Sequence, residues 1–169
     1  MALFSGPRPD RDLLDSLTAQ LGRRPRVLAW AATDDGYVVG LADRMLVRDA
    51  SGWQAYPWHR IATGKWDGGS SLLVWVDTDG CEHTVALSAP ALFPDLFNER
   101  VSASVVFARR VDLGDGRHAT IALRRNLAGG TDEADWQVTP SPGVDLDEPA
   151  VSARIDQELA AVQSDFGIA

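Results

Sequence analysis

The sequence contains very little cysteine or lysine. Cys81 is the only cysteine and Lys65 the only lysine among 169 residues, so nearly all basic side chains are arginines. A single thiol excludes an intrachain disulfide and any zinc or iron–sulfur site that needs several cysteines. We therefore expect a reducing compartment, the cytoplasm, and neither a metal nor another cofactor.

Long apolar runs are also missing. No window approaches the roughly 18–20 uncharged apolar residues of a membrane-spanning helix, and residues 1–10 lack the basic start and apolar core of a signal peptide. The formal net charge of -8 repels phosphate backbones and anionic lipid headgroups. These features predict no nucleic-acid partner and no stable membrane insertion.

The common catalytic motifs are absent as well. The sequence has no phosphate-binding P-loop, no Gly-x-Ser-x-Gly elbow and no Gly-x-Gly-x-x-Gly turn. Cys81 and His83 would face the same side of one strand, but a thiol nucleophile also needs a third group that orients the base. A small buried structural cysteine is the favoured interpretation. We expect no catalytic residues and no enzyme activity.

Metal binding is not predicted either. His59, His83 and His118 lie on three different segments, without the i, i+2 or i, i+4 spacing that places two ligands together. The segment 77–80 begins like a calcium loop, but Ser88 stands where the bidentate acid should be. We interpret 77–80 as a turn.

Between residues 26 and 88 the sequence shows short apolar runs separated by turn residues. Asp-Gly at 35–36 and at 79–80 favours hairpin turns, because glycine adopts the positive φ that such turns need. Short strands joined by such turns predict an antiparallel meander that curls into a sandwich or barrel. The expected strands are 26–33, 36–42, 44–49, 53–57, 62–67, 71–78 and 81–88.

Three amphipathic helices accompany these strands. Residues 10–22 form the first, with Asp10 as its N-cap and Gly22 at its end. Residues 94–106 carry an apolar face that could plug the open end of the curled sheet, and 148–165 form the last helix. A hairpin of 108–113 with 117–125 and a short strand at 136–139 complete the prediction. The fold class is therefore α+β, mainly antiparallel β.

Several motifs are similar to the bacterial branch of the pleckstrin-homology-like (PH-like) superfold. They are Gly40-Leu-Ala-Asp-Arg-Met-Leu46, Tyr56-Pro-Trp-His-Arg-Ile61 and the strand at Trp66. The whole chain resembles uncharacterised PH-like proteins of high-GC bacteria, which share Arg-Val-Leu-Ala-Trp at 26–30 and the helix end at 100–106. The resemblance implies a seven-strand curled sheet with a capping helix.

This resemblance also suggests a division of the chain. Residues 1–25 would be an N-terminal helix and linker, 26–106 the PH-like domain, and 107–169 an extension packed with it as one domain. Headgroup-binding members carry several Lys and Arg between the first two strands, whereas Asp34 and Asp35 stand there. Phosphoinositide binding is therefore not expected, and the fold alone does not fix a function.

Six tryptophans are the one compositional excess. Trp30, Trp66 and Trp75 lie within strand patterns and are expected in the core. Trp53, Trp58 and Trp136 lie near bends, and tryptophan at such positions is enriched at interfaces. The predicted partner-binding residues are Trp53, Tyr56, Trp58, His59 and Arg60.

Two functions remain open at this point. The first is a non-catalytic interaction or assembly protein that binds a protein partner or a second copy through the aromatic-rich face. The alternative is a pocket for a small molecule or lipid, or an enzyme pocket, with Tyr56, His59 and Arg60 at its mouth. An exposed tryptophan patch would favour the first function, and a deep pocket with polar lining the second.

Overall fold

The structure is a computed structural model that describes residues 8–129 and 134–166. The chain divides into two compact units. The first unit runs to Ser104 and includes the segment that begins at Arg125, and the second comprises Val105–Arg124 and the chain from Ala134. The sequence predicted one domain with a boundary at 106, whereas the structure places the division after Ser104.

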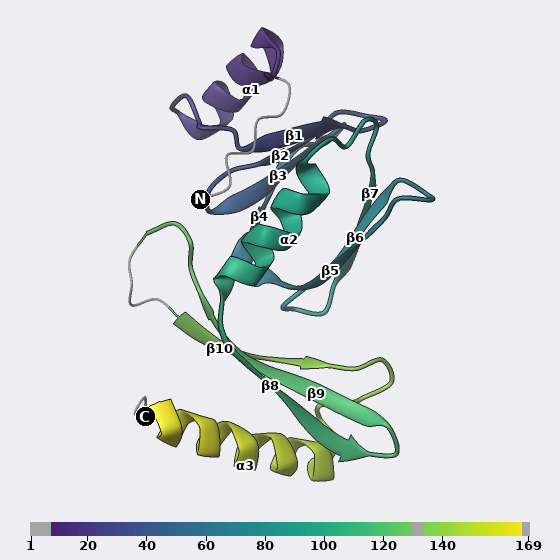
Figure 1. Ribbon diagram of the computed structural model, residues 1–169, viewed down its shortest axis with the longest axis vertical. Coiled ribbons are helices and arrows are strands. Elements are labelled where there is room, and N and C mark those ends of the chain that lie inside the picture. Colours follow the sequence, from purple (N-terminus) through teal and green to yellow (C-terminus); the bar gives the residue numbers. More distant parts are fainter. Residues whose placement is uncertain (1–7, 130–133, 167–169) are drawn as a thin grey trace. The chain divides into compact units, whose positions relative to one another are not determined.

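The first unit contains two antiparallel sheets (Figure 1), which agrees with the predicted α+β class. Seven strands are present, but they form a four-stranded and a three-stranded sheet rather than one sheet. An isolated antiparallel bridge joins Ala32, at the end of β1, to Ser88, two residues beyond the end of β7. The strands are β1 (Ala29–Ala32), β2 (Tyr37–Gly40), β3 (Arg44–Asp49) and β4 (Gly52–Pro57), then β5 (Ile61–Asp67), β6 (Leu72–Asp77) and β7 (Glu82–Ala86). A short 3-10 turn, η1 (Trp58–Arg60), joins β4 to β5.

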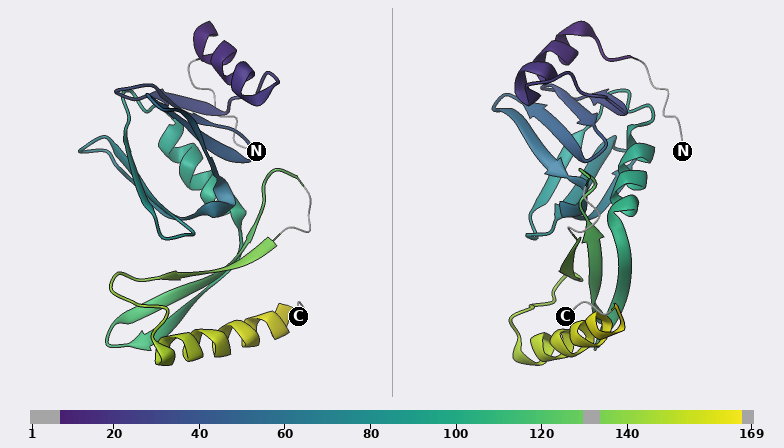
Figure 2. Two further views of the ribbon diagram at one scale, coloured as in Figure 1. Left: turned by 180° about the vertical axis from the view of Figure 1, so that it is seen from behind. Right: turned by 90° about the vertical axis from the view of Figure 1, so that its left-hand side faces the viewer.

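Helix α2 (Phe93–Ser104) packs against both sheets of the first unit (Figure 2). Two glycines permit its close approach: a Cβ atom at Gly40 in β2 would overlap Leu96, and one at Gly64 in β5 would overlap the ring of Phe97. Both α2 side chains are almost completely buried. The helix therefore seals the main core, which comprises Ala29, Ala31, Val38, Met45, Trp58, Ile61, Leu73, Trp75, Leu87, Phe93, Leu96 and Phe97.

Helix α1 (Arg11–Leu21) covers a second cluster of the same unit. Asp10 Oδ1 accepts a hydrogen bond from the backbone N–H of Leu13 at 2.7 Å, and Gly22 ends the helix at φ 68°. Both predicted caps are thus confirmed. The apolar face of α1 buries Leu13 and Leu17 against the four-stranded sheet.

The second unit has its own sheet and core. Its strands β8 (Val105–Gly114), β9 (Arg117–Arg125) and β10 (Ala134–Pro140) lie in the order β10-β9-β8, with α3 (Pro149–Phe166) beside them. The prediction that the second helix continues to 106 is wrong. The β-branched Val105 and Val106 favour a strand, and β8 begins immediately after α2. The unit's buried cluster comprises Val111, Ala119, Ile121, Val151, Ile155 and Val162.

None of the helices within the described ranges is both long and apolar enough to cross a lipid bilayer.

Candidate functional site

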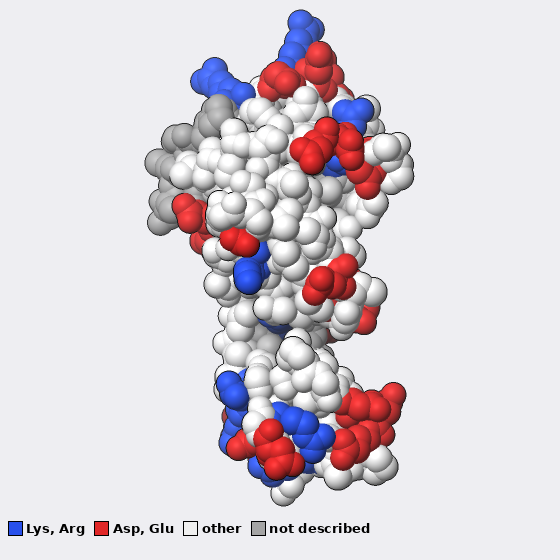
Figure 3. All heavy atoms as spheres, turned by 90° about the vertical axis from the view of Figure 1, so that its right-hand side faces the viewer, with Lys and Arg blue, Asp and Glu red and all other residues white. Residues whose placement is uncertain are grey.

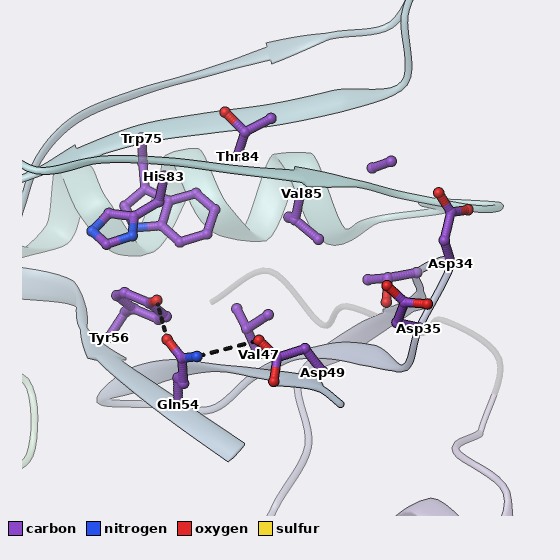
Figure 4. Close-up of a pocket in the computed structure, with 12 residues that line it drawn as sticks. Asp34, Asp35, Val47, Asp49, Gln54, Tyr56, Trp75, His83, Thr84 and Val85 are labelled. Atoms are coloured by element: carbon purple, nitrogen blue, oxygen red, sulfur yellow. Dashed lines mark hydrogen bonds between the residues drawn. The ribbon is translucent and has the colours of Figure 1, made fainter. Parts of the chain in front are cut away.

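A pocket of about 290 Å³ lies between the two sheets of the first unit. Figure 4 shows Trp75 and His83 extending from one sheet toward Tyr56 and Gln54 on the other. The hairpin between β1 and β2 closes one end with Asp34 and Asp35 (Figure 4). The pocket is therefore assembled from four strands, β3, β4, β6 and β7, and one turn that are far apart in the sequence.

One part of the pocket wall is an aromatic cluster. The rings of Trp75 and His83 stack, with centroids 5.1 Å apart and planes at 16°. Tyr56 meets both of them edge-on, at centroid distances of 5.0 Å. Each ring thereby fixes the orientation of the other two, which gives the pocket a rigid, partly apolar wall.

Asp77, which does not line the pocket, contacts the His83 imidazole of this cluster. Its Oδ2 lies 2.8 Å from His83 Nε2, while its Oδ1 accepts hydrogen bonds from the backbone N–H groups of Asp79 and Cys81. Partial burial raises the pKa of Asp77, but the hydrogen bonds to its charged form outweigh this effect. The net result is a pKa below the ordinary value.

A chain of polar contacts follows β4 along the pocket (Figure 4). The Tyr56 hydroxyl donates to Gln54 Oε1 at 2.8 Å, and Gln54 Nε2 donates to Asp49 Oδ2 at 3.2 Å. Burial, together with the negative charges of Asp49 and Asp77, raises the pKa of the Tyr56 phenol. The hydroxyl therefore remains a neutral hydrogen-bond donor through the physiological range.

The electrostatic character of the pocket is acidic. Asp34, Asp35 and Asp49 contribute to its lining, and no lysine or arginine occurs among the lining residues that the structure describes. Hydrogen bonds from the Ser51 hydroxyl and backbone N–H lower the pKa of Asp49, so that this carboxylate is charged at neutral pH. The pocket is thus suited to a ligand that donates hydrogen bonds or carries positive charge.

Trp75, one of the lining residues, carries a buried hydrogen-bond donor without an acceptor among the described residues. Its side chain lines the pocket but is only 2% exposed, and its Nε1 has no hydrogen-bond acceptor within the described chain. Leaving a buried polar N–H without an acceptor costs about 1–3 kcal/mol. Unpaired groups of this kind are rare in folded proteins, and a water molecule, an ion or a ligand that supplies the acceptor would explain this one.

The two tryptophans among the five predicted partner-binding residues, Trp53 and Trp58, both make contacts inside the first unit. Trp58 is completely buried, because η1 turns its indole into the core, where Nε1 donates to the Leu41 carbonyl at 3.0 Å. Trp53 is half-buried under α1, with Nε1 donating to Ser16 Oγ at 3.1 Å and the Arg48 guanidinium over its ring. Neither side chain forms part of an exposed aromatic patch.

The other three predicted site residues lie in different surroundings. Tyr56 belongs to the pocket described above. Arg60 is exposed and pairs with Asp79 at 3.2 Å, and the neighbouring His59 is half-buried in η1. The structure therefore does not bring the five residues together on one face.

The roles of Trp75 and His83 in the pocket were not predicted. The strand pattern predicts Trp75 in the core, which its burial supports, and His83 at an ordinary strand position. The prediction of a buried Cys81 is wrong, because the residue lies in the exposed turn between β6 and β7. Its backbone N–H, rather than its thiol, has a structural role, as a donor to Asp77.

Within residues 8–129 and 134–166, no group of three or more His, Cys, Asp or Glu side chains is arranged to hold a metal ion. A comparison with known proteins found no matching family model, no matching curated protein and no matching solved structure.

Proposed function

We propose that this chain is a non-catalytic binding protein whose first unit takes up a small polar ligand in the pocket between its two sheets. The observation that carries the proposal is the buried, unpaired Nε1 of Trp75 in the pocket wall. The ligand supplies an acceptor to this N–H and directs hydroxyl or ammonium groups toward Asp34, Asp35 and Asp49.

The arrangement of the first unit supports a PH-like fold as part of this proposal. Four antiparallel strands, then three antiparallel strands, then α2 follow one another in the chain, and α2 packs against both sheets. The acidic β1–β2 turn disfavours phosphoinositides, since a headgroup phosphate would face Asp34 and Asp35.

The proposed function is still binding, as the sequence predicts, but the proposed site is the pocket between the sheets instead of an aromatic surface. An assembly face built on Trp53 and Trp58 loses its main support, because both indoles make hydrogen bonds within the first unit. The pocket instead combines an aromatic wall with a few convergent polar groups, which is the usual composition of small-molecule sites.

Thermal unfolding of the intact chain tests the proposal with three sugars that differ in charge. Glucosamine carries an ammonium group as well as hydroxyl donors and acceptors, glucose is neutral, and glucuronate is anionic. We expect glucosamine to raise the melting temperature most and glucuronate least, because a ligand that binds the native state stabilises it and the pocket is acidic.

A pair of matched tryptophan variants makes this test specific. Trp75→Phe keeps an aromatic ring but removes the N–H, and should abolish most of the glucosamine effect. Trp66→Phe makes the same change at a tryptophan that packs against the core without lining the pocket, and should leave the effect intact. No shift with any of the three sugars, or an equal shift in both variants, would contradict the proposal.

A further inference from the structure

A second pocket of the first unit, separate from the acidic pocket between the two sheets, is lined by basic side chains. It lies beside the end of α1, between the segment that leaves this helix and the turn from β2 to β3, and has a volume of about 510 Å³. Its lining residues are Leu21, Arg23, Arg24, Pro25, Arg26, Leu41, Ala42, Asp43 and Arg44. Four arginines thus surround one pocket in a chain whose formal net charge is -8.

Only one of these arginines is neutralised by a carboxylate. Arg44 Nε donates to Asp43 Oδ2 at 2.7 Å, and the same oxygen accepts from its NH2 group. Arg23, Arg24 and Arg26 are exposed, and no carboxylate within the described ranges forms an ion pair with them. Like charges that line one pocket repel each other, so an anion bound among them would reduce this repulsion.

The end of α1 explains only part of this cluster. Cations are favoured near a helix C-terminus, which accounts for Arg23 and Arg24 directly after Gly22. It does not account for Arg26, beyond Pro25, or for Arg44 in the next hairpin. Both of these residues line the same pocket as the first two, so the convergence of all four needs a different explanation.

The chemistry of the lining indicates which anion fits. A guanidinium group is a planar fork that matches phosphate oxygens in pairs, and several such forks in one pocket suit a ligand with several negative charges in a small volume. We propose that this pocket binds a small soluble anion that carries phosphate groups. The inference rests on the arginines alone and does not depend on the aromatic pocket.

A soluble ligand is favoured over a polymer or a membrane. On the face shown in Figure 3, acidic and basic side chains lie in local groups separated by uncharged surface. A nucleic-acid backbone or an anionic bilayer would extend beyond one pocket and meet the excess of acidic residues. A compact anion meets the arginines without that repulsion.

Isothermal titration calorimetry of the intact chain with inorganic pyrophosphate tests this site. We expect saturable binding that weakens as salt is added, because exposed charges are screened. In the double variant Arg24→Gln, Arg26→Gln the affinity should fall about tenfold or more, since two charge-assisted hydrogen-bond donors are lost. Both side chains are exposed, so the variant is expected to fold.

A matched control removes the same charge elsewhere. Arg11→Gln with Arg154→Gln alters two exposed arginines outside the pocket and should leave pyrophosphate affinity almost unchanged. Trp75→Phe should also leave it unchanged, which separates this site from the aromatic pocket. An equal loss in both arginine double variants would overturn the proposal, as would the absence of binding heat. Binding to phosphatidylserine vesicles without any binding of pyrophosphate would also overturn the proposal.

Discussion

His83 Nε2 and Asp77 Oδ2 lie 2.8 Å apart at the end of the β6–β7 hairpin, and the pair fixes the ring that stacks on Trp75. Asp77 also closes the hairpin turn, through its contacts with the backbone of Asp79 and Cys81. One carboxylate therefore shapes both the turn and a wall of the aromatic pocket.

The contribution of Asp77 to stability should depend on pH. Its pKa in the folded chain lies below the ordinary value of 3.8, so its stabilising effect is complete at neutral pH. The effect should disappear as the pH falls below 3.8 and through the folded-state pKa. We expect Asp77→Asn to lower the free energy of unfolding at pH 7 by about 1–2 kcal/mol.

Urea unfolding of Asp77→Asn and the unaltered chain, at neutral and at strongly acidic pH, measures this dependence. Asp156→Asn, an exposed change on α3, serves as the control and should have little effect at either pH. A deficit in Asp77→Asn that is the same at both pH values would contradict the assignment.

The Tyr56 hydroxyl should lose its proton at a higher pH than a free phenol does. Burial raises its pKa above the ordinary 10.0, and the carboxylates of Asp49 and Asp77 act in the same direction. The neutral form is thus favoured by folding, and this contribution should be lost as the pH rises through the folded-state pKa. Phenolate absorbance of the folded chain, compared with that of Tyr56→Phe, isolates this group; titration at or below pH 10 would show the prediction wrong.

Gly64 should tolerate no side chain. A Cβ atom there would overlap the ring of Phe97, which α2 holds against β5. Gly64→Ala should therefore destabilise the chain by about 1–3 kcal/mol, the usual range for overpacking a core. Gly68→Ala in the exposed β5–β6 turn, where a Cβ meets only an ordinary contact with Trp66, is the matched control for thermal unfolding. Equal melting temperatures for the two variants would exclude a tight contact at Gly64.

Ser16 should anchor α1 to the four-stranded sheet. Its hydroxyl accepts hydrogen bonds from Trp53 Nε1 at 3.1 Å and from an Arg48 guanidinium N–H at 3.2 Å. Ser16→Ala should cost about 1 kcal/mol and change the fluorescence of Trp53, even though alanine is the better helix former. Thr18→Ala is the control, because the Thr18 hydroxyl donates to the Leu14 carbonyl of its own helix. A stability loss no greater than in the control would count against the anchor.

The local structure of the first unit could be predicted from the sequence because the signals are local. Asp10 and Gly22 mark the two ends of α1, and Asp-Gly pairs mark two hairpins, although of the two glycines only Gly80, and not Gly36, adopts the positive φ expected there. The break after Ser104 was not predicted, since the apolar spacing of α2 continues through Val105. Only the β-branched pair 105–106 signals the change to a strand.

The candidate site could not be predicted in the same way, because it depends on register and on how two sheets face each other. Tyr56, Trp75 and His83 come from three strands, and nothing in their spacing indicates that their rings meet. The prediction that Trp58 binds a partner failed for a related reason. Trp58 stands beside the polar His59 and Arg60 at a bend, but one turn of 3-10 helix rotates its indole into the core.

The position of α2 in the chain also matters during synthesis. All seven strands of the first unit leave the ribosome before Leu96 and Phe97, the side chains that fill the spaces above Gly40 and Gly64. Until α2 emerges, the apolar faces of both sheets lack their cover, and exposed surface of this kind promotes aggregation of nascent chains. A nascent chain that has released β7 but not yet α2 therefore exposes apolar surface that the complete first unit buries.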